Sequence, residues 1–237
     1  MLRNPLSLKT APELVLGPDE AFTVARTHGV RLFQRCPPVH SIVLGRCRLQ
    51  IGGRIETVSA IALPANTPHA VLEIDADCGG VAYLDPRRYG FADVERLAWR
   101  LRGFIPGQDD LRDAFSDALA APRRRVDPRL LRALTALEQG ATVEQAAAAV
   151  ALSDSRLTHL MTETLGAPPR VWRAWLKLRQ AIGATLMGAM HLTQAAHVAG
   201  FADSAHLTRT CKQLTGVRPA QMMPQTVYLS PELDQAR

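Results

Sequence analysis

The chain has 237 residues, enough for one large domain or two small ones with a substantial hydrophobic core. Hydrophobic residues make up 47% and charged residues 21%, which excludes a largely disordered chain. The net charge of +6 is unevenly distributed: residues 1–120 carry 14 basic and 14 acidic side chains, whereas residues 121–237 carry 14 basic and 8 acidic. The second half therefore has the charge expected of a surface that faces a polyanion.

The cysteines and the N-terminal segment indicate the compartment. Four cysteines without CxxC spacing are too sparse for a disulfide framework; they are Cys36, Cys47, Cys78 and Cys211. The first twenty residues have no apolar stretch typical of a signal peptide. The longest uncharged run includes residues 181–202, and it contains histidines and glycines that suit a membrane span poorly. We expect a soluble, cytoplasmic protein with no membrane partner.

Residues 22–84 consist of short apolar runs separated by Gly, Pro and Asn, which predicts consecutive antiparallel strands. The seven runs are RLFQ, HSIVLG, RCRLQIGG, RIETV, AIALP, HAVLEI and GGVAYL. Gly52-Gly53 is a two-residue hairpin signal. This pattern predicts a small β barrel or sandwich.

From Phe91 the apolar period becomes helical, and it predicts a pair of helices. The first has one apolar face made of Val94, Leu97, Ala98 and Leu101, and the second has one made of Leu111, Ala114, Phe115, Ala118 and Leu119. The fold class is α+β. The predicted organisation is a β domain (1–90), a helical pair (91–120), a Pro- and Arg-rich linker (121–128), an all-helical domain (129–221) and a C-terminal tail (222–237).

The helical half repeats itself at an offset of 50 residues. The matched pairs are Leu157 with Leu207, Thr158 with Thr208, Gly166 with Gly216 and Pro169 with Pro219. Each copy is predicted to be a short helix, a tight turn, a second helix capped by Ser153 or Asp203, and a glycine stop. This is the outline of a helix-turn-helix, whose second helix enters the major groove of DNA.

A helix predicted over residues 170–187 connects the two copies and would set their relative orientation. Two recognition helices held about 34 Å apart would reach successive major grooves on one face of the DNA. A helical bundle that duplicated for packing reasons is the alternative.

Residues 128–221 resemble the DNA-binding domain of the AraC/XylS family of bacterial transcription regulators. The second copy carries the resemblance in Gly200-Phe201-x-Asp203, Leu207-x-Arg209 and Gly216-Val217-x-Pro219. The first copy carries it in Leu152-Ser153-x-Ser155-Arg156-Leu157 and Gly166-x-x-Pro169. The two copies depart mildly from the family at Ala151, where Gly is frequent, and at Met161 and Cys211, where Phe is frequent.

The resemblance implies double-stranded DNA as the partner and a sensing domain for a small-molecule effector at the N-terminus. It also implies a homodimer through residues 91–120, activation of transcription as the commoner outcome, and RNA polymerase as a candidate partner. The operator and the effector are not identified by these residues.

Within the recognition helices, Leu157, Leu160 and Met161 are predicted to face the core, and Cys211 to be a small core residue. The predicted DNA-facing side chains are Ser155, Arg156, Thr158 and His159 in the first helix and Ser204, Ala205, His206, Thr208, Arg209 and Lys212 in the second. Arg209 is a candidate for bidentate recognition of guanine, with a phosphate or an internal acid as its alternative partners. Lys212 is expected to contact phosphate.

The β region, chiefly through LPANTPHAV at residues 63–71, resembles the cupin-like sensing domain of the same family. The paired histidines of enzymatic cupins are absent. His40 and His69 could hold a metal with Glu56 or Glu73, but we expect two structural or surface histidines and no cofactor. A thiol sensor built from Cys36, Cys47 and Cys78 is the alternative to three buried strand residues.

These observations favour a ligand-responsive, sequence-specific DNA-binding regulator. A constitutive DNA-binding protein whose β domain only dimerises is the second hypothesis. A cupin-type metalloenzyme is the third, and the sequence carries no catalytic motif that supports an enzyme.

Overall fold

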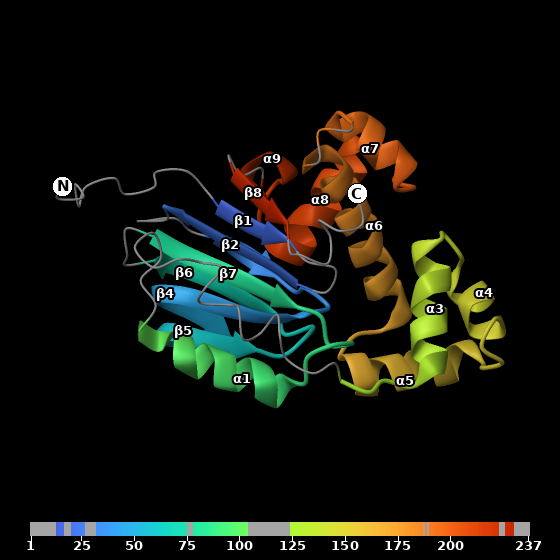
Figure 1. Cartoon of the computed structure of the whole chain (residues 1–237), viewed down its shortest axis with the longest axis horizontal. Coiled ribbons are helices and arrows are strands. Elements are labelled where there is room, and N and C mark those ends of the chain that lie inside the picture. Colours follow the sequence, from blue (N-terminus) through green and yellow to red (C-terminus); the bar gives the residue numbers. More distant parts are fainter. Residues whose placement is uncertain are drawn as a thin grey trace.

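The chain has an α+β fold, as predicted, with a β sheet at one end and a helical domain at the other (Figure 1). This structure is a computed structural model that describes residues 13–16, 20–26, 32–74, 78–103, 124–186, 188, 190–222 and 226–229. No helix among these residues is long and apolar enough to cross a membrane.

The described strands form one eight-stranded sheet in the order β3-β6-β4-β7-β2-β1-β8, with β5 paired to β4 outside this path. All pairs are antiparallel except β1 with β8, which is parallel. The strands are β1 (Glu13–Leu16), β2 (Glu20–Arg26), β3 (Leu32–Arg35), β4 (His40–Ile51), β5 (Arg54–Leu63), β6 (His69–Ile74), β7 (Cys78–Leu84) and β8 (Thr226–Leu229).

The predicted division of residues 40–63 into four short strands is wrong, because β4 and β5 are each continuous. The glycine that suggested a break, Gly45, takes a φ of 97° at a register shift between Leu44 and Cys47. Such a bulge lets a strand bend without ending. The first half of β4 consequently pairs with β7 and its second half with β6. The hairpin at Gly52-Gly53 is confirmed, with φ values of 53° and 82°.

Two parts of the sheet lie outside the region from which strands were predicted. β1 and the start of β2 precede residue 22, and β8 lies in the segment assigned to a C-terminal tail. β8 pairs with β1 across more than 200 residues, Glu13 aligning with Thr226. A four-residue strand whose partner is this distant leaves no local hairpin signal in the sequence.

Helix α1 (Phe91–Arg100) continues into a 3-10 turn (Leu101–Gly103) and packs against β4 and β5. Its predicted apolar face is confirmed, since all four of its residues are buried. Trp99 lies on the opposite side with 66% of its surface exposed, and the Arg102 guanidinium stacks 3.9 Å from its ring centre. The second predicted helix of the pair lies outside the described residues.

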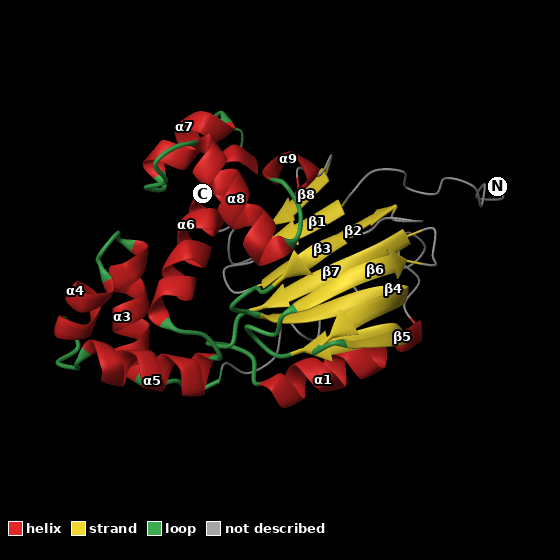
Figure 2. Cartoon of the chain, turned by 180° about the vertical axis from the view of Figure 1, so that it is seen from behind, coloured by secondary structure: helices red, strands yellow, loops and turns green. Residues whose placement is uncertain are grey.

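The helical domain consists of α3 (Pro128–Glu138), α4 (Val143–Ala148), α5 (Asp154–Leu165), α6 (Pro169–Leu186), α7 (Leu192–Val198), α8 (Ser204–Thr215) and the short α9 (Pro219–Met222). Helix α3 begins at Pro128 because Asp127 caps it, its carboxylate accepting from the Arg129 N–H at 2.8 Å. Figure 2 shows α6 running between two groups of helices, α3 to α5 and α7 to α8.

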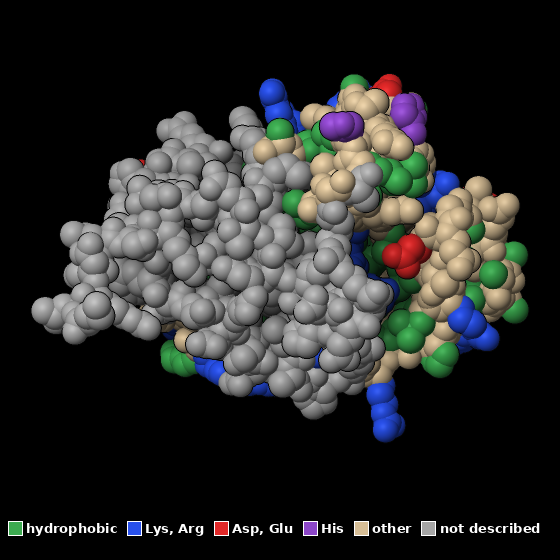
Figure 3. Space-filling view, turned by 45° about the horizontal axis from the view of Figure 1, so that its top comes forward, with side chains coloured by type: hydrophobic (Ala, Val, Ile, Leu, Met, Phe, Trp, Pro, Cys, Tyr) green, Lys and Arg blue, Asp and Glu red, His purple; other side chains and the backbone are tan. Residues whose placement is uncertain are grey.

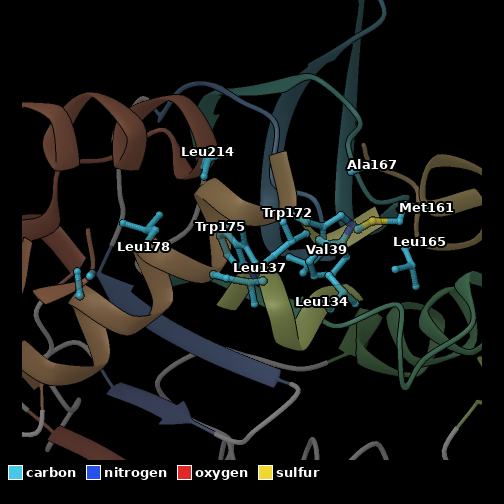
Figure 4. Close-up of a cluster of buried hydrophobic side chains, with 14 of the residues drawn as sticks. Val39, Leu134, Leu137, Met161, Leu165, Ala167, Trp172, Trp175, Leu178 and Leu214 are labelled. Carbon is cyan, nitrogen blue, oxygen red and sulfur yellow. The ribbon is translucent and has the colours of Figure 1, made fainter. Parts of the chain in front are cut away.

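The core of the helical domain extends onto the sheet. Val39 and Tyr83 from the β domain belong to the same buried cluster as Trp172 and Trp175 of α6 (Figure 4). The rings of Tyr83 and Trp175 meet edge to face at 5.7 Å between centres. The two parts of the chain therefore share a hydrophobic interface.

Candidate nucleic-acid interface

The two candidate recognition helices, α5 and α8, begin and end with the same devices. The Ser153 hydroxyl accepts from the Arg156 N–H at 3.2 Å, and the Asp203 carboxylate accepts from the His206 N–H at 2.6 Å. Both helices end at a left-handed glycine, with φ of 79° and 80°. The predicted caps and stops are confirmed, and these two helices lie 50 residues apart in the sequence.

The turn before each recognition helix shows that the repeat offset is not constant. Ala151 and Gly200 hold the same position, with φ of 54° and 77°, and they are 49 residues apart. In each turn the N–H of the next residue, Leu152 or Phe201, donates to a carbonyl five residues earlier, at 3.0 and 2.9 Å. The fixed offset of 50 is therefore wrong for α4 and α7, because the second copy has one extra residue, Ala202, between turn and cap.

The connecting helix α6 contacts both helix-turn-helix units through long basic side chains. Arg173 donates from Nη2 to the Gly140 carbonyl before α4 at 3.3 Å, and Lys177 donates from Nζ to the Gly200 carbonyl at 2.7 Å. Desolvation and the Arg173 charge lower the pKa of Lys177. The helix is therefore bonded to the loop that precedes α4 in the first unit and to the turn between α7 and α8 in the second.

Helix α5 presents its predicted polar face outward. Ser155, Arg156, Thr158 and His159 are all exposed, while Leu157 and Met161 are fully buried and Leu160 is half-buried. The His159 Nε2 lies 3.5 Å from a carboxylate oxygen of Glu163 one turn later. This acid places a negative charge on the exposed face of α5.

Helix α8 presents a mixed face. Ala205, His206 and Arg209 are exposed, whereas Ser204, Thr208 and Lys212 are half-buried. The Thr208 hydroxyl donates to the Ser204 carbonyl at 2.8 Å, so only its acceptor capacity is available to a base. Cys211 is fully buried, as predicted.

Two contacts orient the beginning of α8. The His206 ring meets the Phe201 ring edge to face at 5.2 Å. The His206 N–H is the main cause of a lowered Asp203 pKa, to which the nearby Arg209 charge also contributes. The charge of Arg209 thus interacts with the Asp203 carboxylate, although the Arg209 side chain remains exposed. In Figure 3, histidine side chains gather at the helical end of the molecule, where the exposed histidines of α7 and α8 are His197 and His206.

The comparisons identify this region. A family model described as a helix-turn-helix domain matches residues 146–225. The described residues in this range belong to an AraC-type helix-turn-helix domain. Domains of this type bind DNA, so DNA binding is assigned to this region of the chain.

Solved structures share the fold of the chain beyond the AraC-type domain. A crystal structure of ToxT from Vibrio cholerae O395 has 11% identity, covers 86% of this chain and 97% of its own, and has a TM-score of 0.54. A structure of wild-type ToxT from Vibrio cholerae strain SCE256 with unsaturated fatty acid bound has 10% identity, 94% and 97% coverage and a TM-score of 0.53. No curated protein sequence matches the chain significantly.

The AraC-type domain meets the β domain at the C-terminal ends of both recognition helices. The Cys36 N–H donates to the Gln213 carbonyl of α8 at 3.3 Å. At the end of α5, Gly166 lies on Ala65, so closely that a Cβ added to Gly166 would be 2.7 Å from the Ala65 Cβ. Arg124 donates from Nη1 to the Thr164 carbonyl at 3.2 Å. Sequence reasoning missed these contacts because none has a local pattern.

Arg124 also ties the predicted linker to the β domain. Its N–H donates to the Arg88 carbonyl at 2.8 Å and its Nη1 to the Pro86 carbonyl at 3.2 Å. The described residues of the predicted linker, 124–128, are therefore attached to both domains.

The two histidines considered for a metal site are buried and point to separate partners. His40 Nδ1 accepts from the Ala65 N–H at 3.0 Å. His69 contacts the Thr67 carbonyl through Nδ1 at 2.8 Å and accepts from Arg35 Nε through Nε2 at 2.8 Å. Burial, aided by Arg124 for His40 and by Arg35 for His69, lowers each pKa to about 4. No group of three metal-ligating side chains occurs among the described residues.

The same holds for the cysteines of the β domain: among the described residues, none belongs to a group of three metal-ligating side chains. Cys47 is buried, and burial raises its pKa to about 11. Cys36 is half-buried, and its thiol donates to the Asn66 Oδ1 at 3.2 Å. The side chain of Cys78 lies outside the described residues.

Proposed function

We propose that the protein is a sequence-specific transcription regulator whose α5 and α8 read DNA and whose β domain responds to a small molecule. The observation that carries this proposal is the pair of N-capped recognition helices with exposed polar N-terminal halves. Two such helices joined by one continuous helix suit two successive segments of a major groove. The excess positive charge of the second half of the chain supports binding to phosphate.

The two helices differ in the recognition that their side chains support. Arg209 of α8 is exposed and carries a fork of donors that matches guanine. At the matching position α5 has His159, next to Glu163. We expect α8 to contribute more of the base discrimination and α5 to contribute a weaker preference through Ser155, Thr158 and His159.

Ligand control is supported by the contacts between the domains. The β domain touches the last turns of both α5 and α8, so a change in its shape is transmitted to both recognition helices without an intermediary. A ligand shifts this arrangement only if it binds two arrangements with different affinity. The fatty-acid-bound ToxT structure has the same fold, and the fold therefore accommodates a small organic ligand.

Dimerisation is the proposed role of the region after residue 90. Helix α1 uses its apolar face on the sheet, which leaves Trp99 and Arg102 on the outer side as the described surface for a second copy. Sedimentation of the full chain at micromolar concentration tests this proposal. A dimer mass that falls to the monomer mass in Trp99→Ala supports it, and a monomer mass for the wild type contradicts it.

The DNA-binding proposal is tested by selection of genomic fragments with the purified full-length protein at near-physiological salt, followed by sequencing. An enriched motif with two half-sites about one helical turn apart supports the proposal. Binding without any motif would leave only the electrostatic contribution and would argue for an architectural protein. If no carboxylate, sugar or aromatic compound changes the affinity of the protein for DNA that carries the motif, the constitutive alternative is favoured.

A further inference from the structure

Strand β5 has an open outer edge. It pairs with β4 on one side, and no described strand lies on its other side. Its first four residues, Arg54–Thr57, are all exposed, and the exposed fraction of Ile55 is 55%. The edge of a sheet presents a row of backbone N–H and C=O groups that can pair with another strand. β5 therefore offers a surface to which a further strand can be added.

The sequence of β5 lacks the usual features that prevent such pairing. Natural proteins often protect an edge strand with lysine, proline or a bulge. None of the ten residues of β5 is lysine or proline. The bulge in the β4–β5 pair puts its extra residue on β4, because three steps from Leu44 to Cys47 match two steps from Ala60 to Val58. The edge of β5 is therefore free to pair.

The register of the β4–β5 hairpin decides which residues face the open edge. Its turn has two residues, and Ile51 aligns with Arg54 across it. The residues that flank such a turn form a hydrogen-bonded pair, and bonded pairs alternate with non-bonded pairs along an antiparallel ladder. Arg54 and Glu56 therefore direct their backbone groups toward β4. Ile55 and Thr57 direct theirs outward, where an added strand would bond them.

The charges along this edge are self-complementary. The exposed Ile55 lies between Arg54 and Glu56, which are exposed as well. If a second copy of β5 runs antiparallel to the first with a two-fold axis at Ile55, each Arg54 lies opposite Glu56 of the other copy. Moving the axis by one residue puts Arg54 opposite Arg54, or Glu56 opposite Glu56, and like charges directly opposite each other are destabilising. The sequence thus favours one register, in which the two Ile55 side chains meet at the centre.

We propose that β5 pairs antiparallel with β5 of a second copy of this chain, about a two-fold axis at Ile55. This inference rests on the proposed dimerisation and adds a contact on the sheet. A contact with this symmetry closes as a dimer, because the same edge is used by both copies. Helix α1 and its 3-10 turn contact β5, so the exposed Trp99 surface lies on a neighbouring element.

The test is sedimentation equilibrium of the full-length protein with charge-reversal variants. Arg54→Glu and Glu56→Arg each place like charges opposite each other twice in the homodimer, so each should weaken the homodimer Kd by at least about tenfold. An equimolar mixture of these two variants regains both opposite-charge pairs. The mixture should form a heterodimer with a Kd within about threefold of the wild-type value, and so should the homodimer of the double variant.

Two further variants separate strand pairing from net charge and from loss of folding. Arg132 is exposed on α3, so Arg132→Glu makes the same change in net charge as Arg54→Glu and should leave the dimer intact. Ile55→Pro removes an N–H that points outward and none that bonds β4. This variant should keep the far-ultraviolet circular dichroism spectrum of the wild type and should sediment as a monomer.

Three results would overturn the proposal. The first is a wild type that sediments as a monomer at micromolar concentration. The second is a homodimer of Arg54→Glu or Glu56→Arg that is as tight as that of the wild type, because the contact between copies would then lie elsewhere. The third is a mixture of these two variants that forms no heterodimer, because the register about Ile55 would then be wrong.

DNA affinity measured on the same samples keeps this inference apart from the proposed function. A wild-type dimer that responds to the charge reversals but binds no DNA would support the strand pairing and contradict the proposed regulator. Operator binding that is weaker in each single variant than in their mixture supports both. Specific DNA binding by a wild type that is monomeric overturns the strand pairing alone.

Discussion

Ala151 and Gly200 hold the same left-handed position in the two helix-turn-helix turns, with φ of 54° and 77°. A side chain in this conformation costs about 1–2 kcal/mol, and glycine avoids that cost. The first turn thus carries a strain that the second turn does not. The two turns have the same conformation although they contain different residues, because in each turn a backbone N–H donates to the carbonyl five residues earlier.

A reciprocal pair of substitutions tests this strain. Ala151→Gly should raise the free energy of unfolding by about 0.5–1 kcal/mol, and Gly200→Ala should lower it by about 1 kcal/mol or more. Gly200→Val should lower it further, since a β-branched side chain resists this φ. Urea denaturation of the full chain measures all three. An Ala151→Gly variant that is less stable than the wild type would contradict the argument.

The contact between Gly166 and Ala65 leads to a second prediction. Gly166→Ala adds both the left-handed strain and a contact of 2.7 Å with the Ala65 Cβ. Gly140→Ala is the matched control, because Gly140 has a φ of 98° and no described neighbour within 4 Å of the added carbon. The first variant should lose about 1–3 kcal/mol more stability than the second. Adding Ala65→Gly to Gly166→Ala should recover this difference, and equal losses would argue that α5 does not rest on the β domain in solution.

Arg209 and His159 occupy matching positions in α8 and α5 and should contribute unequally to recognition. Arg209→Ala should weaken binding to the selected operator by about 1–3 kcal/mol, roughly 5- to 150-fold, and should relax one base position. His159→Ala should have a smaller effect. Fluorescence anisotropy with single-base operator variants measures both, with the distant surface variant Arg48→Ala as the control. An unchanged base preference in Arg209→Ala would leave Arg209 as a phosphate contact only.

The buried histidines predict a loss of stability in mild acid. The pKa values of His40 and His69 are about 4 in the folded protein, below the ordinary value of 6.5. The unfolded chain therefore binds more protons as pH falls from 6.5, so the stability present above that pH is lost progressively toward pH 4. Each histidine contributes up to about 3 kcal/mol of this loss.

His40→Asn tests the assignment, because its side-chain oxygen can replace Nδ1 as the acceptor for the Ala65 N–H. The free energy of unfolding of this variant should decrease less steeply between pH 6.5 and 4.5 than that of the wild type. Identical pH slopes for the two proteins would contradict a lowered pKa of His40 in the folded protein.

The sequence by itself determined the features that neighbouring residues decide. Ser153 and Asp203 each bond an N–H three residues later, the glycines 166 and 216 each end a helix, and Gly52-Gly53 closes a hairpin between adjoining strands. The apolar faces of α1, α5 and α8 follow from helical periodicity. These contacts span a few residues, so residue type and spacing are sufficient to predict them.

Only the tertiary structure decided the contacts between distant segments. The parallel pairing of β8 with β1 and the contact of Gly166 with Ala65 each depend on how the elements pack. Arg35 is a further example. It follows the short apolar run of β3 in the sequence, and it is buried because β3 packs against β6 and α8. A buried polar group has no periodic signature, because its surroundings come from residues far away in the chain.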